Sequence, residues 1–355
     1  MTLCRIAVAW VCLLSSGGIA AEELRDWRSK LSVHGYVAQA YAVSQSQQIL
    51  GIPPEGTTEY RDLALQVRYD AGRRNSVVAQ VRHQRFGEER ERDPVELDWA
   101  FYQRNFSDRV AVKAGRIPLP LGIFNEAGGA VATSPFFRPP TEFYERRFTS
   151  KTLEGILTSV SLGDPGGWSF DVDAYGGRWA LDQWSGGDAE ARDAYGAQVW
   201  VNTPWEGVRA GGGAYRCTVH PATGDTADYL MLHASLEADL GRWMFASEYL
   251  TGDLDTYGDY EASYAQAGFQ ASRRLSIHLR GARARMNDPF DGRTGDARIS
   301  DDLGLTFNYA FRPAVVLKLE GHTNVGLLAR DRPPELYETP PVTSRYLIVS
   351  VVLGF

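Results

Sequence analysis

The end of the chain constrains its fold more than any other segment, because residues 344–355 (SRYLIVSVVLGF) alternate in character and finish on an aromatic side chain. Leu347, Val349 and Val351 fall in phase with Phe355. Successive side chains of a β-strand point to opposite faces, so one face of this segment is apolar along its length. The chain therefore closes on a strand that needs either a protein core or lipid against one side.

The first residues have the composition of an export signal. Arg5 precedes an apolar run at residues 6–14, which is followed by small side chains at residues 15–21. This order is typical of a signal peptide that is cleaved at the end of the small-residue run. The apolar run is shorter than the about 20 residues that a membrane-spanning helix requires. We therefore predict a signal peptide at residues 1–21 and an exported domain at residues 22–355.

Composition narrows the class of the exported domain. It has no stretch of 18 consecutive apolar residues, which argues against membrane-spanning helices. Aromatic residues make up 12% of the chain, with 9 Trp, 17 Tyr and 15 Phe, which suits the two interfacial girdles of a membrane β-barrel. Cys217 is the one cysteine outside the predicted signal, so strand pairing rather than a disulfide must stabilise the fold. The formal charge of −7 argues against nucleic acid as a partner.

Strand-like runs follow one another along the exported domain. In one of the clearest, Leu303, Leu305 and Phe307 alternate with polar or small residues. We find about 16 runs, an even number, as single-chain bacterial barrels require. They cover residues 31–41, 60–70, 76–85, 95–104, 110–116, 152–162, 168–179, 194–203, 208–219, 228–238, 242–251, 261–271, 275–285, 301–311, 314–323 and 343–355.

The connections between these runs are alternately short and long. The short ones are rich in Gly, Pro, Asn and Asp, which favour tight turns. Short turns at one rim and long loops at the other are the layout of a membrane barrel. A soluble β-sandwich has the same side-chain alternation with the opposite sense, so the strands alone leave both architectures open.

The predicted signal, the terminal Phe355 and the regular order of connections favour the barrel. We expect an all-β fold, a transmembrane antiparallel β-barrel of about 16 strands, with a long third loop folded into the lumen. The closing strand also resembles the assembly signal of bacterial outer-membrane barrels. This resemblance implies the outer membrane of a Gram-negative bacterium.

The third long connection, residues 117–150, is the main candidate for a functional segment. It holds five prolines, which forbid a central strand, and several aromatic side chains, which argue against disorder. Loops longer than about 12–15 residues are usually functional or disordered. A compact third loop that enters the lumen would narrow a channel.

Residues 112–126 (VKAGRIPLPLGIFNE) resemble the G-x-x-x-P-x-G-x segment of the phosphate-selective porin O and P family, which also leads into its third loop. The resemblance implies a 16-stranded, usually trimeric outer-membrane channel for anions, lined by Arg and Lys. The chain departs from that pattern at Pro118, where basic residues are often found, and in the mixed charge of its lumen.

Opposed charges around this loop predict a constriction with a transverse field, which favours polar and zwitterionic solutes and gives a modest anion preference. Arg146 and Arg147 are the strongest candidates to line the pore. Each charge could equally form an ion pair that holds the loop to the wall. The predicted set comprises Lys113, Arg116, Arg138, Arg146, Arg147 and Lys151 against Glu126, Glu142 and Glu145, with Glu154 as a further acid.

The function that this sequence predicts is a porin, a channel for passive diffusion of small hydrophilic solutes and anions. We expect a homotrimer in contact with outer-membrane lipid and lipopolysaccharide, and no cofactor. An outer-membrane enzyme is one alternative, but the six histidines lie in no recognisable catalytic setting and no G-x-S-x-G motif surrounds a serine. Acidic residues in 251–260 and 286–300 do not match a calcium-binding loop. A non-conducting adhesion barrel is the third alternative.

Overall fold

The computed structural model describes residues 27, 29–88, 95–125, 134–144, 151–164, 166–181, 189–221, 225–255, 258–287, 296–326 and 342–355. These residues form sixteen strands, and each predicted run overlaps one of them. The first eight are β1 (Leu31–Ser44), β2 (Thr57–Asp70), β3 (Asn75–Phe86), β4 (Glu96–Asn105), β5 (Val110–Pro118), β6 (Thr152–Gly163), β7 (Ser169–Leu181) and β8 (Ala189–Asn202). The last eight are β9 (Val208–His220), β10 (Ala227–Leu240), β11 (Trp243–Asp253), β12 (Asp259–Gln270), β13 (Leu275–Asn287), β14 (Asp296–Arg312), β15 (Val315–Gly326) and β16 (Val342–Gly354).

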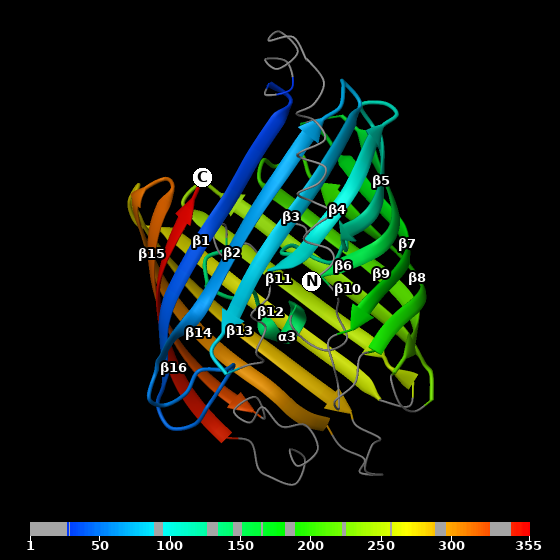
Figure 1. The fold of residues 1–355 in the computed structure, drawn as a ribbon. Helices are drawn as coiled ribbons and strands as arrows, with labels where there is room; N and C mark the ends of the chain where they lie inside the picture. Colours follow the sequence, from blue (N-terminus) through cyan, green and yellow to red (C-terminus); the bar gives the residue numbers. More distant parts are fainter. Residues whose placement is uncertain are drawn as a thin grey trace, which may run out of the picture.

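The strands close into a barrel in which every strand pairs with its sequence neighbours and β16 pairs with β1 (Figure 1). The closing ladder runs from Tyr36 opposite Gly354 to Ser44 opposite Tyr346. The last residue takes part as well, because the backbone N–H groups of Gly35 and Phe355 each donate to the carbonyl of the other at 3.0 Å. A closed sheet has no unpaired edge, which is what a hydrocarbon environment demands.

Side-chain burial identifies which face of the sheet meets lipid. Along β14, Leu303, Leu305 and Phe307 are 56%, 41% and 41% exposed, whereas Asp302 and Thr306 are 7% and 0% exposed. On this strand apolar side chains therefore point outward and polar ones inward, and exposed apolar side chains cover the outer face of the other strands as well, whereas the inner face carries both polar side chains and buried apolar ones. Such an outer face is typical of a barrel whose outer surface is covered by lipid.

Short turns gather at one rim of the barrel, together with the start of β1 and the carboxy terminus (the upper rim in Figure 1). They connect strands at residues 71–74, 106–109, 164–168, 203–207, 241–242, 271–274 and 313–314. Gly207 shows why these turns need glycine: its φ is +79°, and an added Cβ would lie 2.1 Å from the carbonyl oxygen of Asp239. In membrane barrels the short-turn rim faces the periplasm, so the opposite rim is extracellular.

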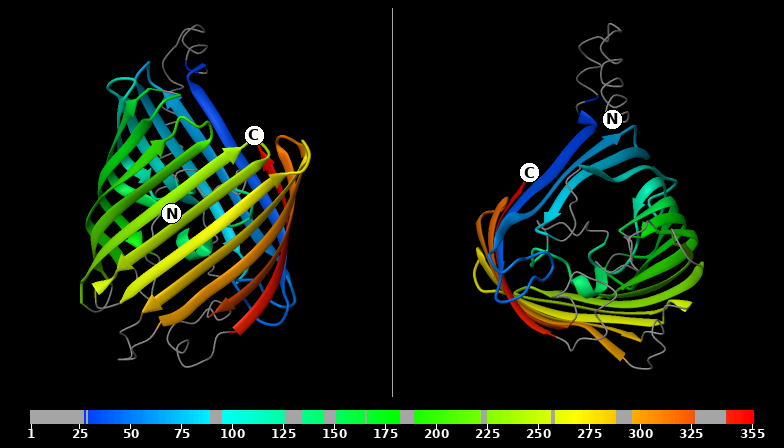
Figure 2. Two further views of the ribbon diagram at one scale, coloured as in Figure 1. Left: turned by 180° about the vertical axis from the view of Figure 1, so that it is seen from behind. Right: turned by 60° about the horizontal axis from the view of Figure 1, so that its bottom comes forward.

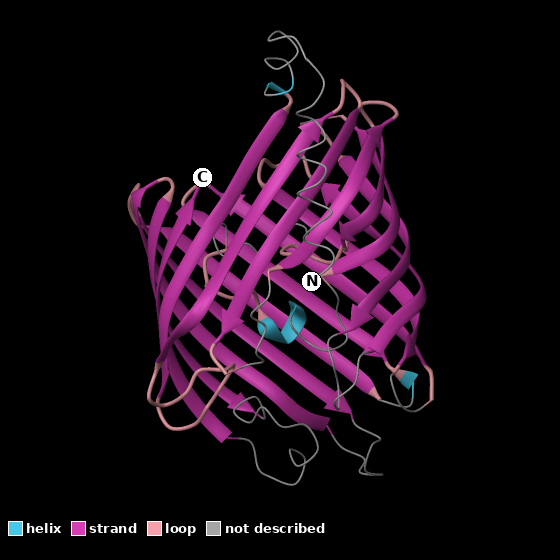
Figure 3. Cartoon of the chain, viewed as in Figure 1, coloured by secondary structure: helices cyan, strands magenta, loops and turns pink. Residues whose placement is uncertain are grey.

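A four-residue helix, α3 (Thr141–Tyr144), lies inside the ring of strands. Figure 2 shows it next to the yellow strands, and it contacts β12 and β13. In Figure 3 it is the short cyan helix at the centre of the view, surrounded by strands. Within the described ranges, no helix is both long and apolar enough to cross a membrane.

Candidate functional site

The connection between β5 and β6 enters the barrel, and we call its described residues, 119–125 and 134–144, the inner loop. Most of its large apolar side chains are fully buried, including those of Leu119, Leu121, Phe136 and Phe137. Leu119 and Leu121 pack in one buried apolar cluster with inward side chains of the wall such as Leu157 and Leu250, which stabilises the loop inside the barrel. Residues 126–133 and 145–150 of this connection lie outside the described residues.

Glu248 on β11 is the first anchor of the inner loop. It is almost completely buried, and its carboxylate accepts hydrogen bonds from the backbone N–H of Ile123 at 2.9 Å, the Tyr264 hydroxyl at 2.6 Å and the Ser235 hydroxyl at 2.5 Å. The Tyr144 hydroxyl donates to the same carboxylate. No cation forms an ion pair with it among the described residues, so these four donors compensate its desolvation.

The loop backbone fits closely against this anchor at Gly122. Its N–H donates to the side-chain oxygen of Gln198 on β8 at 2.8 Å. Its φ is +61°, and an added Cβ would lie 2.3 Å from Glu248 and 2.4 Å from the Tyr144 hydroxyl, so no other residue fits without displacing them. Burial, and then the negative charge of Glu248, raise the pKa of Tyr144 well above its ordinary value. Tyr144 therefore stays protonated and keeps donating.

A second anchor ties residues 134–142 to β13, β14 and β15. It satisfies loop backbone groups with buried side chains of the wall, so the two partners compensate each other's loss of water. Behind it, His322 pairs with Asp302 at 2.9 Å between Nδ1 and Oδ2. The contacts to the loop are Lys318 Nζ to Ser134 O at 2.5 Å, Asn308 Nδ2 to Pro135 O at 2.9 Å, Phe137 N to Glu320 Oε1 at 2.7 Å, Arg280 to Arg138 O at 3.0 Å, and Ser300 Oγ to Glu142 Oε1 at 2.5 Å.

Two predicted pore-lining residues are parts of these anchors instead. Arg138 is buried; its guanidinium donates to the Tyr60 hydroxyl at 3.2 Å and stacks over the Phe86 ring at 4.4 Å. Glu142 is buried against Ser300. These charges hold the loop to the wall, which is the structural alternative that the sequence left open.

Arg116 and Lys113 lie on opposite faces of β5. Arg116 precedes the fully buried Ile117 and pairs in register with the exposed Glu154, so it points out of the barrel. Its placement in the lumen was therefore wrong. Lys113 is half-buried on the inner face, with Nζ 5.8 Å from the centre of the Phe101 ring.

The remaining predicted residues divide into two groups. The carbonyl of Lys151 accepts a hydrogen bond from the Leu119 N–H at 3.0 Å, so its backbone fixes the start of the inner loop. Glu126, Glu145, Arg146 and Arg147 lie outside the described residues, and their role in the constriction stays a prediction.

Two aspartates on the inner face of β7 complete the wall beside the loop. Asp173 accepts a hydrogen bond from Ser159 at 2.5 Å, and Asp171 accepts one from Asn202 at 2.8 Å. Asp173 also pairs in register with Gln198, the residue that holds Gly122, so it lies at the level of the inner loop. The alternation in the sequence places both aspartates on the polar face of their strand. It does not predict the hydrogen bond between Gly122 and Gln198, which brings the inner loop to the level of Asp173.

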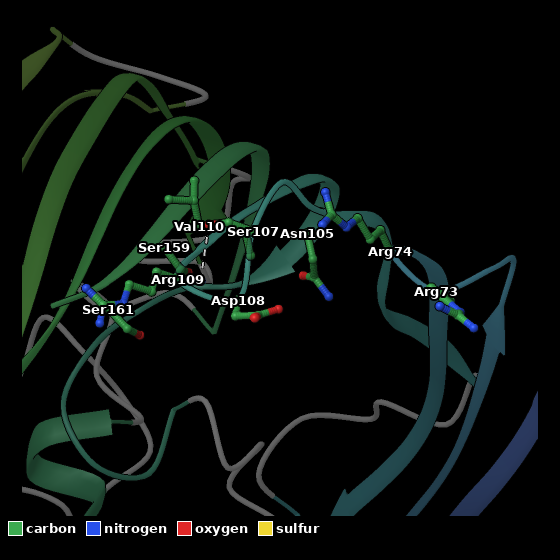
Figure 4. Close-up of a pocket in the computed structure, with 10 residues that line it drawn as sticks. Arg73, Arg74, Asn105, Ser107, Asp108, Arg109, Val110, Ser159 and Ser161 are labelled. Carbon is green, nitrogen blue, oxygen red and sulfur yellow. Dashed lines mark hydrogen bonds between the residues drawn. The ribbon is translucent and has the colours of Figure 1, made fainter. Parts of the chain in front are cut away.

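The periplasmic mouth holds a cavity of about 450 Å³, lined by turns 71–74 and 106–109 and by the end of β6. In Figure 4 its arginine side chains fan out along the rim and do not converge on one point. Arg74 donates to the carbonyl of Phe106 at 2.9 Å. The mouth is therefore a polar vestibule. Across the described ranges, no three His, Cys, Asp or Glu side chains come together as metal ligands.

No family model matches the chain, and neither does any curated protein. Solved structures match over nearly its whole length. OmpF of Salmonella typhi, in a complex with daunomycin, has a TM-score of 0.63 at 13% identity and covers 92% of this chain and 97% of that chain. An anion-selective porin from Comamonas acidovorans has a TM-score of 0.58 at 12% identity, covering 92% and 99%. OmpT, an outer-membrane protein of Vibrio cholerae in a trimer form, has a TM-score of 0.59 at 11% identity, and the match covers 92% of this chain and 99% of that chain.

At these identities the likeness concerns the fold alone. The chain has the closed, 16-stranded antiparallel barrel of Gram-negative outer-membrane proteins, porins among them. The resemblance of residues 112–126 to the phosphate-selective porin O and P family stays a prediction.

Proposed function

We propose that this protein is a porin, an outer-membrane channel through which small hydrophilic solutes and ions diffuse passively. The observation that carries the proposal is the contrast inside the barrel. The charges of the anchors are buried against the inner loop, while Lys113, Asp171 and Asp173 on the facing strands keep part of their surface exposed. A polar, solvated wall beside a fixed loop is what a water-filled passage needs.

The charge preference of the passage depends on which groups border the open space. A modest anion preference would come from Arg146 and Arg147, as the sequence predicts. A cation preference would come from Asp171 and Asp173, which outnumber Lys113 on the inner faces of β5, β6 and β7. The sign of the reversal potential under asymmetric salt decides between them.

We further propose a homotrimer, embedded in outer-membrane lipid and lipopolysaccharide. The support is the fold shared with OmpT, whose structure is described as a trimer form, and the apolar outer belt of Leu303, Leu305 and Phe307. Cross-linking in native membranes tests the assembly: a ladder that ends at three subunits supports it, and a monomer alone removes it.

An enzyme is the less supported alternative. The buried pair of Asp302 and His322 has the acid–base arrangement of a catalytic dyad, but in the described structure Nε2 of His322 faces Glu320 at 3.7 Å, and no serine, threonine or cysteine bonds to the ring. Tyr346 stacks on the same ring at 4.5 Å and closes it off. The pair therefore serves the loop anchor.

Conductance in a planar lipid bilayer tests the proposal. Purified protein should produce stepwise current increases of uniform size that persist at low voltage. A barrel that inserts, as judged by protease protection, and yet carries no current would remove the channel and leave the adhesion alternative.

A further inference from the structure

Three arginines surround one aspartate on the outer surface of the barrel. Arg285 on β13 donates to both carboxylate oxygens of Asp301 on β14, at 2.7 and 2.9 Å. Arg283 and Arg298 each reach the same carboxylate at 3.2 Å through Nε. All four point outward, since the next residue on β14, Asp302, is buried in the lumen. These four side chains carry an excess of two positive charges, which Glu261, in register with Arg285 on the outward face of β12, reduces to one.

This excess sets the cluster apart from other outward ion pairs of the described residues. On β6, β7 and β8, Arg178 and Arg192 are balanced by Glu154 and Glu190. On β9 and β10, Arg216 is balanced by Asp228 at 2.7 Å. Balanced pairs on a surface need no further partner, whereas guanidinium groups that share a single carboxylate retain donors for another anion.

The height of the cluster indicates what that anion is. On β14, the outward residue next to Asp301 toward the membrane centre is Leu303, and Leu305 follows; on β13, Leu279 lies at the corresponding level. Two residues of strand span about 7 Å, so the arginines begin about 7 Å beyond an exposed apolar belt, at the extracellular end of the strands. Acyl chains cover such a belt, and lipid headgroups lie directly above it.

We propose that Arg283, Arg285 and Arg298 form a binding site for a phosphate group of an anionic lipid in the outer leaflet. Guanidinium groups bind phosphate through paired, directional N–H donors, which makes arginine suited to this headgroup. Asp301 holds the three side chains together. Arg283 and Arg298 are 64% and 47% exposed and contact the phosphate; Arg285 is 20% exposed and acts as a positioning residue.

The chain offers a matched control for the test. Arg178 and Arg192 are 60% and 56% exposed on the same outer surface, but their charges are balanced. We therefore compare R283Q/R298Q with R178Q/R192Q. Both double variants remove two positive charges from exposed outward positions, and neither touches the lumen, so conductance of both should equal that of the wild type. A lipid-binding defect is thereby distinguished from a failed channel.

The measurement is native mass spectrometry of delipidated protein in detergent, titrated with bisphosphorylated lipid A. R283Q/R298Q should lower the apparent affinity by about thirtyfold, since each surface arginine contributes about fivefold to binding of an anionic headgroup. R178Q/R192Q should bind like the wild type. If R283Q/R298Q folds poorly, as judged by heat-modifiable migration, R298Q alone should show about a fivefold loss.

Four results would overturn the site. The first is an equal loss of lipid A affinity in both double variants. The second is that the wild-type protein binds dephosphorylated lipid A as tightly as the bisphosphorylated form. The third is displacement of the lipid by millimolar inorganic phosphate, which identifies a site for free phosphate. The fourth is complete loss of binding on chelation of divalent cations, which assigns the contact to bridged carboxylates.

Discussion

The two sides of the lumen use the same kinds of charged residue in different ways. On β15, Lys318 and Glu320 are almost completely buried because backbone groups of the inner loop bond to them. On β5 and β7, Lys113 and Asp173 are only half-buried, and side chains of the wall supply what bonds they make. The first side fixes the loop, and the second meets solvent. A count of the charged residues in the lumen therefore predicts ion selectivity only after the side chains that are buried against the inner loop have been left out.

Buried and exposed charges also differ in how much free energy they contribute and to which property. A charge removed from water depends on its partners, so loss of one member of a buried pair typically costs about 3–5 kcal/mol. A charge beside water is screened, and its effect on a passing ion about 8 Å away is about 0.5 kcal/mol. Substitutions on the anchored side should change stability, and substitutions on the open side should change ion selectivity.

The largest effect should follow Glu320→Ala. The change removes the acceptor of the Phe137 N–H and the buried carboxylate that lies 3.7 Å from Nε2 of His322. We expect the free energy of unfolding to fall by about 3–5 kcal/mol and the open-channel current to become noisier as the loop loosens. Urea unfolding in lipid vesicles, followed by tryptophan fluorescence, measures the first; single-channel recording measures the second.

Asp171→Ala is the control from the open side, and its unfolding free energy should stay within about 1 kcal/mol of the wild type. Equal destabilisation by the two substitutions would show that the sides do not differ as described. A stable Glu320→Ala variant with quiet current would mean that the second anchor does not hold the loop.

Much of the fold was predictable, because the two-residue period of a strand assigns faces whatever the barrel's final shape. The alternation of Leu303, Leu305 and Phe307 indicated an outward face, and the structure confirms it. The terminal Phe355 indicated a closing strand, and its backbone does pair with Gly35. The opposite face then points into the barrel, where contacts with the inner loop bury many of its side chains.

The site was less predictable, for two different reasons. Arg138 and Glu142 have the composition of a constriction, but their burial depends on wall residues far along the chain, such as Arg280, 142 residues beyond Arg138. Local patterns hold no information about such contacts. Arg116 is different: it lies three positions after Lys113, an odd spacing, so the strand period itself sets the two on opposite faces, and the sequence contained the answer.

On the open side, D171N/D173N should shift ion selectivity toward anions. Two negative charges leave the wall, one at the level of the loop and one two residues closer to the periplasmic turn, so the cation-to-anion permeability ratio should fall by about fivefold, from about 0.5 kcal/mol for each carboxylate. Reversal potentials in asymmetric dilute salt measure this shift. The effect should shrink in 1 M salt, where the screening length is about 3 Å. A ratio that does not change at low salt would mean that ions pass elsewhere, beside the Arg146 and Arg147 that the sequence favoured.

The smallest effect distinguishes the two faces of one strand. Lys113→Gln removes an inward charge, so the permeability ratio should rise by about twofold, opposite in sign to D171N/D173N. Arg116→Gln removes the same charge three residues later on the outward face, and its ratio should equal that of the wild type. The same reversal-potential measurement serves both, with each protein's unfolding midpoint as a check on its fold. If Arg116→Gln shifted the ratio as much as Lys113→Gln, Arg116 would have to reach the lumen, and the outward face assigned to it would be wrong.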